Sequence, residues 1–169
     1  MPPAFSTARA AAEYEGSLRD IIHAFKYDGR RSLAKPLAAM MREHGSDLLG
    51  EADVVVPVPL HPWRRLRRGF NQAHELARHL DCRVVHALWR ARPTAAQSGL
   101  RPAQRRRNVR HAFRVSPLLR ESLEHISVLL VDDVRTTGAT LDACARVLKE
   151  AGALRVTALT IARARPHIS

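Results

Sequence analysis

Residues 126–140 constrain the fold of this chain more than any other part of its sequence. The apolar run at 128–131, Val-Leu-Leu-Val, predicts a strand that is buried on both faces, as strands of parallel sheets are. Two carboxylates, Asp132 and Asp133, follow where that strand should leave the sheet. Beyond a loop of small residues, apolar side chains recur at helical spacing: Leu141, Cys144, Ala145 and Leu148. The segment therefore predicts a strand, an acidic pair, a loop and a helix, in that order.

The predicted helix start and the acidic pair together suit a phosphorylated sugar. A helix N-terminus has unpaired backbone N–H groups and partial positive charge, so a phosphate monoester can bind there. Gly138 lets the backbone approach a phosphate, and further donors come from the hydroxyls of Thr136, Thr137 and Thr140. The carboxylates can accept hydrogen bonds from vicinal hydroxyls or hold a hydrated Mg²⁺. The alternative is an ordinary strand-to-helix turn in which Asp and Thr serve only as caps.

Length and composition indicate one globular domain. The chain has 169 residues, of which 46% are hydrophobic and 26% charged, as is ordinary for a soluble protein. No apolar run approaches the length of a membrane span, and no signal-peptide core follows Met1. We therefore expect a cytoplasmic protein without membrane insertion. Cys82 and Cys144 are far apart and lack a metal-ligand spacing, so we expect two largely buried thiols.

The net charge is the unusual property of the composition. It is +12 at pH 7, and arginine supplies nearly all of the positive charge. An excess of this size attracts polyanions in general. The partner can be a heavily phosphorylated small substrate, a nucleic acid or an acidic protein, and composition leaves these three classes open.

The first part of the chain predicts two helices and then a strand. Residues 1–13 are small and poorly patterned, so we expect a poorly ordered N-terminus ahead of a single domain at 14–169. Apolar residues then mark one face of a helix that ends near residue 28: Leu18, Ile21, Ile22 and Phe25. A second helix follows from Ser32 to Gly45, and both helices should cover the sheet. Residues 53–59 predict a short buried strand that is broken by prolines.

Four arginines lie within residues 64–68, directly after that strand. Such a cluster can be no more than a solvated surface. Here it stands between the carboxyl end of a strand and a helix with Leu76 and Leu80, near the sheet edge that should carry the acidic pair. At that edge the guanidinium groups could bind a diphosphate.

Residues 128–140 resemble the phosphoribosyl-pyrophosphate signature of the type I phosphoribosyltransferases: four hydrophobic residues, two acids and a Thr-Thr-Gly-x-Thr loop. The resemblance implies an α/β fold of that type, a mostly parallel central sheet flanked by helices, with two N-terminal covering helices. It implies that Asp132 and Asp133 contact the ribose hydroxyls and serve catalysis, with Mg²⁺ bound mainly through the substrate and these two acids as the protein ligands to consider. The 5′-phosphate would be held by Arg135, Thr136, Thr137, Gly138, Ala139 and Thr140.

Other motifs narrow the resemblance to the ComF family, competence-associated relatives of these transferases. They are Val-Pro-Val-Pro-Leu at 56–60 and Arg-Gly-Phe-Asn-Gln at 68–72, together with Lys26 and Tyr27 at a helix end. A later stretch matches the spacing of the family at Thr94, Gln97, Leu100, Arg105, Asn108 and Phe113. Proteins of the family usually begin with a Cys-rich zinc ribbon, which this sequence does not contain.

Residues 91–110 are rich in arginine and have no apolar period. A long loop inside a compact domain is usually functional, so we expect either a lid over the ligand or an exposed basic loop that meets a nucleic acid or a partner. In type I phosphoribosyltransferases a mobile loop at this point closes over the diphosphate. The resemblance therefore favours a lid and implies a catalytic contact from Arg105. The diphosphate-binding residues that we expect are Pro59, Leu60, Arg68, Asn71, Arg105 and Asn108.

Two functions of different classes remain open. The first is a phosphoribosyltransferase that joins phosphoribose from phosphoribosyl pyrophosphate to an unidentified acceptor. By the resemblance, Thr136 argues against an oxopurine acceptor, because members that use one carry an Asp there. The second is a ComF-type accessory protein of DNA uptake, whose basic surface binds single-stranded DNA or a helicase-like competence protein and whose sugar-phosphate site is regulatory or vestigial. Only Trp63 and Phe70 lie near the first arginine cluster as stacking surfaces, so support for strand binding is weak. A homodimer also remains open.

Overall fold

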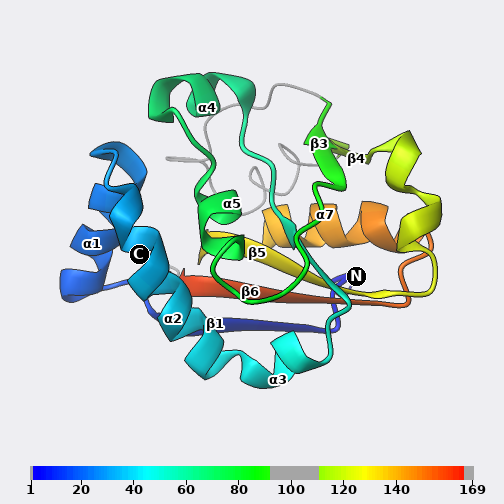
Figure 1. Cartoon of the computed structure of the whole chain (residues 1–169), viewed down its shortest axis with the longest axis horizontal. Helices are drawn as coiled ribbons and strands as arrows, with labels where there is room; N and C mark the ends of the chain where they lie inside the picture. The colour runs from blue at the N-terminus through cyan, green and yellow to red at the C-terminus, as the bar shows by residue number, and fades with distance from the viewer. Residues whose placement is uncertain (1, 92–110, 166–169) are drawn as a thin grey trace.

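Four parallel strands form the central sheet of the computed structural model, which describes residues 2–91 and 111–165 (Figure 1). They are β1 (Thr7–Glu13), β2 (Val54–Pro57), β5 (Ser127–Arg135) and β6 (Arg155–Arg163), in the spatial order β1-β6-β5-β2. β5 is paired on both sides, because Leu129 lies opposite Val55 of β2 and Thr157 of β6. This interior position explains why β5 has a continuous apolar run.

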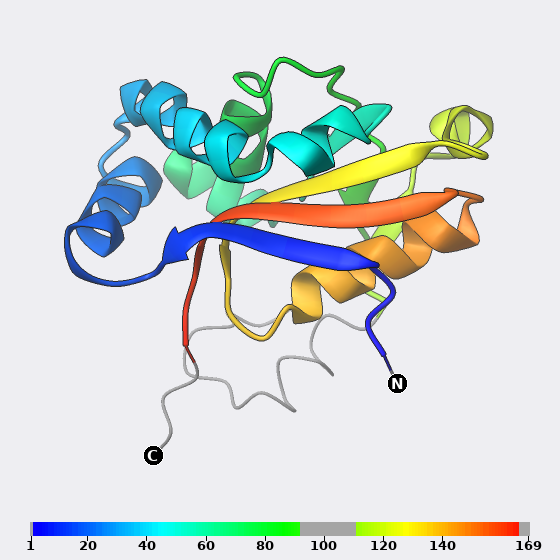
Figure 2. The same cartoon turned by 90° about the horizontal axis from the view of Figure 1, so that it is seen from below.

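Helices cover both faces of this sheet, as Figure 2 shows. One face carries α7 (Ala139–Glu150), and the other carries α1 (Gly16–Tyr27), α2 (Ala34–His44) and α5 (Gln72–Ala77). Successive side chains of a strand point to opposite faces, so each strand contributes to two cores. In β5, Val128 and Leu130 point to the α7 side and pack in one core. Leu129 and Val131 point to the opposite side and pack in the second core, with the other three helices.

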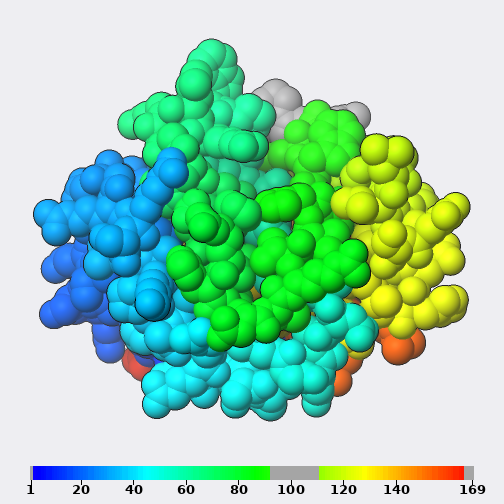
Figure 3. All heavy atoms as spheres, viewed as in Figure 1, coloured from blue at the N-terminus to red at the C-terminus, as the bar shows by residue number. Residues whose placement is uncertain are grey.

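Shorter elements connect the main ones. A 3₁₀ turn (Arg31–Leu33) precedes α2 and α3 (Ser46–Gly50) follows it. After β2, α4 (Pro62–Arg68) projects from the surface, which is plain in the space-filling view (Figure 3). An antiparallel pair, β3 (Leu88–Arg90) with β4 (Phe113–Val115), is followed by two 3₁₀ turns (Pro117–Leu119 and Glu121–Leu123).

The expected architecture is confirmed: a parallel central sheet flanked by helices, in which α1 and α2 are the two covering helices expected ahead of the strand at 53–59. The strand at 53–59, the strand through residues 128–131 and the helix after the small-residue loop are present as β2, β5 and α7. In α1, Ile22 and Phe25 are fully buried as predicted. Ile21 was expected on the same face but is 41% exposed, because the buried stripe of this helix is narrower than the apolar pattern.

The expectation of a poorly ordered N-terminus is wrong for Thr7–Glu13, which form β1. β1 pairs in parallel with β6, and its first residue lies opposite Thr157. The hydrogen bonds that make it a strand come from a segment about 150 residues away in the chain. A local sequence pattern cannot reveal such a pairing.

The arginine cluster was expected between a strand and a helix, and the structure has it in a helix of its own, α4. Pro62 occupies the first turn of α4, and His61 Nδ1 accepts a hydrogen bond from Trp63 N at 3.3 Å. Gly69 ends the helix in the left-handed conformation, with φ of 73°. In the described part of the chain, no helix combines the length and apolar character needed to cross a membrane.

Candidate functional site

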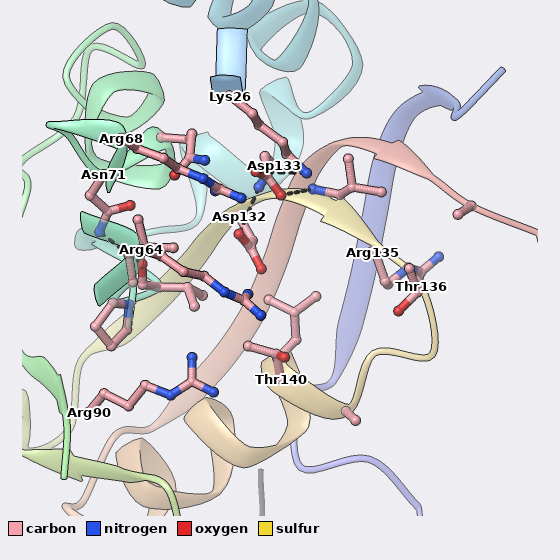
Figure 4. A pocket seen from close by; sticks show the side chains of 18 of the residues that line it. Lys26, Arg64, Arg68, Asn71, Arg90, Asp132, Asp133, Arg135, Thr136 and Thr140 are labelled. Atoms are coloured by element: carbon pink, nitrogen blue, oxygen red, sulfur yellow. Dashed lines mark hydrogen bonds and ion pairs between the residues drawn. The ribbon is translucent and has the colours of Figure 1, made fainter. Parts of the chain in front are cut away.

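A pocket of about 610 Å³ opens at the carboxyl end of the sheet. Its walls come from the end of β5 and the loop into α7, the segment after β2, α4, the end of α1 and β3. Open α/β sheets bind ligands at this edge, because the loops that leave the strands diverge there and form a crevice. Figure 4 shows the side chains that line the pocket, which we take as the candidate site.

The two acids at the end of β5 point in different directions. Alternation along the strand sends Asp133 toward α1 and Asp132 into the centre of the pocket (Figure 4). Asp133 Oδ2 lies 3.1 Å from Lys26 Nζ, and Asp133 Oδ1 accepts a hydrogen bond from Val134 N at 2.6 Å. Asp132 Oδ1 accepts a hydrogen bond from Asp133 N at 2.9 Å. The acidic pair is therefore ordered by the protein before any ligand binds.

Burial and the charges around the pair set the protonation of this site. Burial, followed by repulsion from Asp133, raises the pKa of Asp132 to about 7. Burial opposes the charged form of Lys26, yet attraction to Asp133 and Asp132 outweighs it and raises the pKa of this lysine above its ordinary value. At neutral pH, Lys26 is consequently a full positive charge, whereas Asp132 is divided between its two protonation states.

Three arginines form what we call the guanidinium wall: Arg64 and Arg68 of α4 and Arg90 of β3. Figure 4 shows them on one side of Asp132, with Arg135 and Thr136 on the other. The ring of Phe113 lies 5.2 Å from Arg90 Cζ, and burial together with the nearby Arg64 lowers the pKa of the Arg90 guanidinium. Guanidinium groups present planar sets of donors that match phosphate oxygens, so this wall suits a diphosphate.

Residues 135–140, the phosphate loop, connect β5 to α7. Gly138 lies directly before the helix with φ of 76°, a left-handed conformation that disfavours residues with a Cβ. Ala139 N donates a hydrogen bond to Thr137 Oγ1 at 3.4 Å. Of the six residues predicted here, five line the pocket, namely Arg135, Thr136, Gly138, Ala139 and Thr140. Thr137 does not line it, and its side chain instead serves the start of the helix.

Four of the residues predicted for the diphosphate also line the pocket: Pro59, Leu60, Arg68 and Asn71. Asn71 has a structural task, because its Nδ2 donates to Val58 O at 3.1 Å and its Oδ1 accepts from Ala73 N at 3.0 Å. It thereby caps α5 and fixes the segment after β2. Arg105 and Asn108, with the predicted lid, lie outside the described residues.

Among the residues that line the pocket, Lys26, Tyr27 and Arg90 had no site role assigned from the sequence. Lys26 and Tyr27 lay at a recognised helix end, so that signal could have found two of them. Arg64 lies in the arginine cluster that was predicted to bind a diphosphate, and it does line the pocket. Arg90 had no such signal, because β3 is short and its place beside the pocket depends on the pairing with β4.

The donor set at this site fits a Mg²⁺ that is held mainly by its ligand. The carboxylates of Asp132 and Asp133 are hard oxygen donors of the kind that Mg²⁺ prefers. Across residues 2–91 and 111–165, however, no group of three or more His, Cys, Asp or Glu side chains is placed to hold a metal ion. Phosphate oxygens of a ligand would have to supply most of the coordination.

Comparison with known proteins first defines the class of protein to which this chain belongs. Residues 28–167 match the family model of the phosphoribosyl transferase domain. Two solved structures share the fold at 26% identity over 78% of this chain and 26% of theirs: an allosteric regulatory enzyme of purine biosynthesis (TM-score 0.51) and a glutamine phosphoribosylpyrophosphate amidotransferase from Bacillus subtilis (TM-score 0.50). This chain therefore spans about a quarter of each of those proteins. The fold is that of the type I phosphoribosyltransferases.

Within that class the chain belongs to the ComF family. It is 33% identical to the DNA utilization protein YhgH of Escherichia coli over 96% of its own length and 74% of that protein. It is 31% identical to Competence protein F of Haemophilus influenzae, over 96% of this chain and 75% of the relative. It is also 31% identical to Competence protein ComFC of Bacillus subtilis, over 92% of this chain and 63% of that relative.

Proposed function

We propose that this protein binds phosphoribosyl pyrophosphate and transfers its phosphoribosyl group to an acceptor that is still to be identified. The observation that carries the proposal is the order of groups across the pocket. Asp132 projects between the phosphate loop and the guanidinium wall (Figure 4). The proposed ligand has the matching order, with the ribose hydroxyls between a 5′-phosphate and a diphosphate.

Each part of the pocket has one task in this proposal. The phosphate loop binds the 5′-phosphate at the start of α7, and Asp132 accepts hydrogen bonds from the ribose hydroxyls. The bond between ribose C1 and the diphosphate oxygen breaks, and the acceptor's nucleophilic atom forms the new bond to C1. The guanidinium wall stabilises the negative charge that develops on the departing diphosphate. Mg²⁺ bound to the diphosphate would add to that stabilisation.

Calorimetric titration with phosphoribosyl pyrophosphate, with and without Mg²⁺, tests the proposal. We expect saturable binding that Mg²⁺ strengthens, and a loss of affinity of about tenfold or more in Arg64→Gln. Arg65→Gln is the matched control, because Arg65 lies on the same helix but is exposed and does not line the pocket. Its affinity should stay within about twofold of wild type, since exposed charges contribute little.

Two results would contradict this proposal. One is the absence of saturable binding to wild-type protein at low salt, where attraction to a basic protein is strongest. The other is undiminished affinity in folded protein that carries both Asp132→Asn and Asp133→Asn. Equal losses in Arg64→Gln and Arg65→Gln would show that net charge, and not the guanidinium wall, attracts the ligand.

We propose a role in DNA utilization as the second candidate function, supported by the names of the relatives and by the surface of α4. Trp63 and Leu66 of α4 are 72% and 75% exposed, and Arg65 and Arg67 stand beside them. An exposed aromatic ring next to cations can stack on an unpaired base while the cations contact phosphates. In this role, single-stranded DNA would lie along α4, which projects from the protein (Figure 3).

Anisotropy of a labelled DNA strand at several salt concentrations tests this second function. Trp63→Ala should weaken binding about fivefold or more, because loss of one stacked base costs roughly 1 kcal/mol or more. Trp89→Ala is the control, since Trp89 is 50% exposed on a different element, β3. Identical affinities for wild type and Trp63→Ala would exclude stacking on α4.

A further inference from the structure

Lys26 is the counter-ion of the carboxylate pair at the end of β5. Its side chain is 16% exposed and that of Asp133 is 13% exposed, so their 3.1 Å contact is largely shielded from solvent. α1 supplies this lysine from its last turn, and the helix is anchored by the fully buried Ile22 and Phe25. The ammonium is thus held by a docked helix and is not a mobile surface charge.

The contacts of the pair leave little room for a second cation. Among the described residues, three of the four carboxylate oxygens already accept from protein donors: Asp133 Oδ2 from Lys26, Asp133 Oδ1 from Val134 N, and Asp132 Oδ1 from Asp133 N. Asp132 Oδ2 is the remaining oxygen. A divalent metal seeks several oxygen ligands, and one open carboxylate oxygen cannot hold it firmly.

We propose that Lys26 is a positioning residue of the ligand site that takes the place of a divalent metal at the acidic pair. It orients Asp133 and offsets its negative charge, so that a metal ion enters only with the phosphates of the ligand. This inference rests on the proposed function for its ligand, but its claim about the ligand-free protein stands on the ion pair alone.

There is also a physical reason for the protein itself to supply the cation at the acidic pair. Two adjacent carboxylates in a partly buried site repel each other, and without a counter-ion the repulsion would disfavour the ionised form of both. A lysine supplied by α1 offsets part of that repulsion at all times. Asp132 is then ready for the ribose hydroxyls, and ligand binding does not first require the capture of a free metal ion.

Binding of Mn²⁺ to the ligand-free protein, followed by electron paramagnetic resonance, tests the proposal without any sugar phosphate. Wild type should bind Mn²⁺ weakly, and Lys26→Met should bind it about tenfold or more tightly, because removal of the ammonium opens the pair to metal. Adding Asp133→Asn to Lys26→Met should abolish the gain. Should Lys26→Met fail to fold, Lys26→Gln keeps a polar group at the position and carries the same expectation. Wild-type Mn²⁺ affinity in these folded single variants would overturn the proposal.

Titration with phosphoribosyl pyrophosphate provides the second readout. Lys26→Met should lose about tenfold or more in affinity, while Lys26→Arg, which restores a cation, should stay within about threefold of wild type. Lys35→Met is the matched control, because Lys35 is an exposed lysine of α2 outside the pocket. Equal losses in Lys26→Met and Lys35→Met would overturn the positioning role. If wild type binds no phosphoribosyl pyrophosphate, the proposed function fails, and the Mn²⁺ experiment still decides the role of Lys26.

Discussion

The guanidinium of Arg68 lies over the ring of Tyr27, with 4.7 Å between Cζ and the ring centroid, and Arg68 Nη2 donates a hydrogen bond to Tyr27 Oη at 3.0 Å. Arg68 belongs to α4 and Tyr27 to α1, 41 residues apart in the chain. The stacked ring and the hydrogen bond together restrict the rotamers of this long side chain. Arg68 is therefore positioned at the pocket before a ligand arrives, which reduces the entropy lost on binding.

Tyr27→Ala should weaken binding of phosphoribosyl pyrophosphate about fivefold, because Arg68 must then be ordered by the ligand at a cost of roughly 1 kcal/mol. Tyr27→Phe keeps the stacked ring and loses only the hydrogen bond, so its affinity should fall about twofold. Calorimetry on both variants checks the order of the effects. Equal affinities for wild type and Tyr27→Ala would show that Arg68 needs no support from α1.

Gly138→Ala should destabilise the protein and also damage the phosphate loop. A Cβ at Gly138 would meet Phe5 Cζ at 3.8 Å and Arg135 Cδ at 3.9 Å, so the strain comes from the φ of 76° and not from a clash. A left-handed residue with a Cβ costs roughly 1 to 2 kcal/mol, which chemical denaturation can measure. We expect phosphoribosyl pyrophosphate affinity to fall about tenfold as the loop relaxes.

Gly152→Ala is the control for Gly138→Ala, because Gly152 has φ of 100° at the opposite end of α7. Its Cβ would meet the flexible side chain of Glu124 at 3.0 Å. It should lose similar stability while keeping its ligand affinity. A parallel loss of affinity in both variants would mean that general destabilisation, and not the loop, weakens binding.

Ligand affinity should increase as the pH rises through about 7. Burial and Asp133 raise the pKa of Asp132 to about 7, and ribose hydroxyls donate hydrogen bonds to its ionised form. Below that pH the ligand must displace a proton, so binding should weaken by up to about tenfold per pH unit. Calorimetry at pH 7 in buffers of different ionisation enthalpy should detect proton release by wild type and less release by Asp132→Asn. Equal proton release by wild type and Asp132→Asn would show that Asp132 is not the group that loses the proton.

The same pKa predicts that Asp132→Asn stabilises the fold at high pH. An unfolded Asp titrates near 3.9, so between about pH 4 and pH 7 the native state binds more protons than the unfolded state, and stability falls as the pH rises. Above pH 7 the native state carries an ionised, poorly solvated carboxylate. At pH 8 the free energy of unfolding of Asp132→Asn should exceed that of wild type by about 1 to 2 kcal/mol, and at pH 4 the two should agree.

Thermal unfolding at both pH values measures this difference, at about 2 to 4 °C per kcal/mol for a chain of this size. Asp20→Asn is the control, because the Asp20 side chain is 75% exposed and lies outside the pocket, so its unfolding midpoint should match that of wild type. A lower midpoint for Asp132→Asn than for wild type at pH 8 would show that the ionised carboxylate stabilises the native state. It would thereby contradict the assigned pKa.

Local sequence was sufficient for the elements that carry strong periodic patterns. The apolar run of β5 and the helical spacing of α7 define the order of strand, acidic pair, loop and helix. A strand buried on both faces has a continuous apolar run, whereas a helix buried on one face has apolar residues three or four positions apart. The sequence also singled out Gly138 as a residue that lets the backbone approach a phosphate, and the structure gives it a left-handed conformation directly before the helix. The full set of phosphate-loop residues could be named because residues 128–140 resemble the type I phosphoribosyltransferase signature.

What the tertiary structure decided is which distant residues share the pocket. β1 is a strand only because β6 lies beside it, and Arg90 reaches the site only because β3 pairs with β4. The partners of the acidic pair and of Arg68, namely Lys26 and Tyr27, come from α1, whose position depends on how its buried face packs. A sequence determines local periodicity and backbone preference directly, whereas the contacts between elements arise from packing of the whole core, which no local pattern encodes.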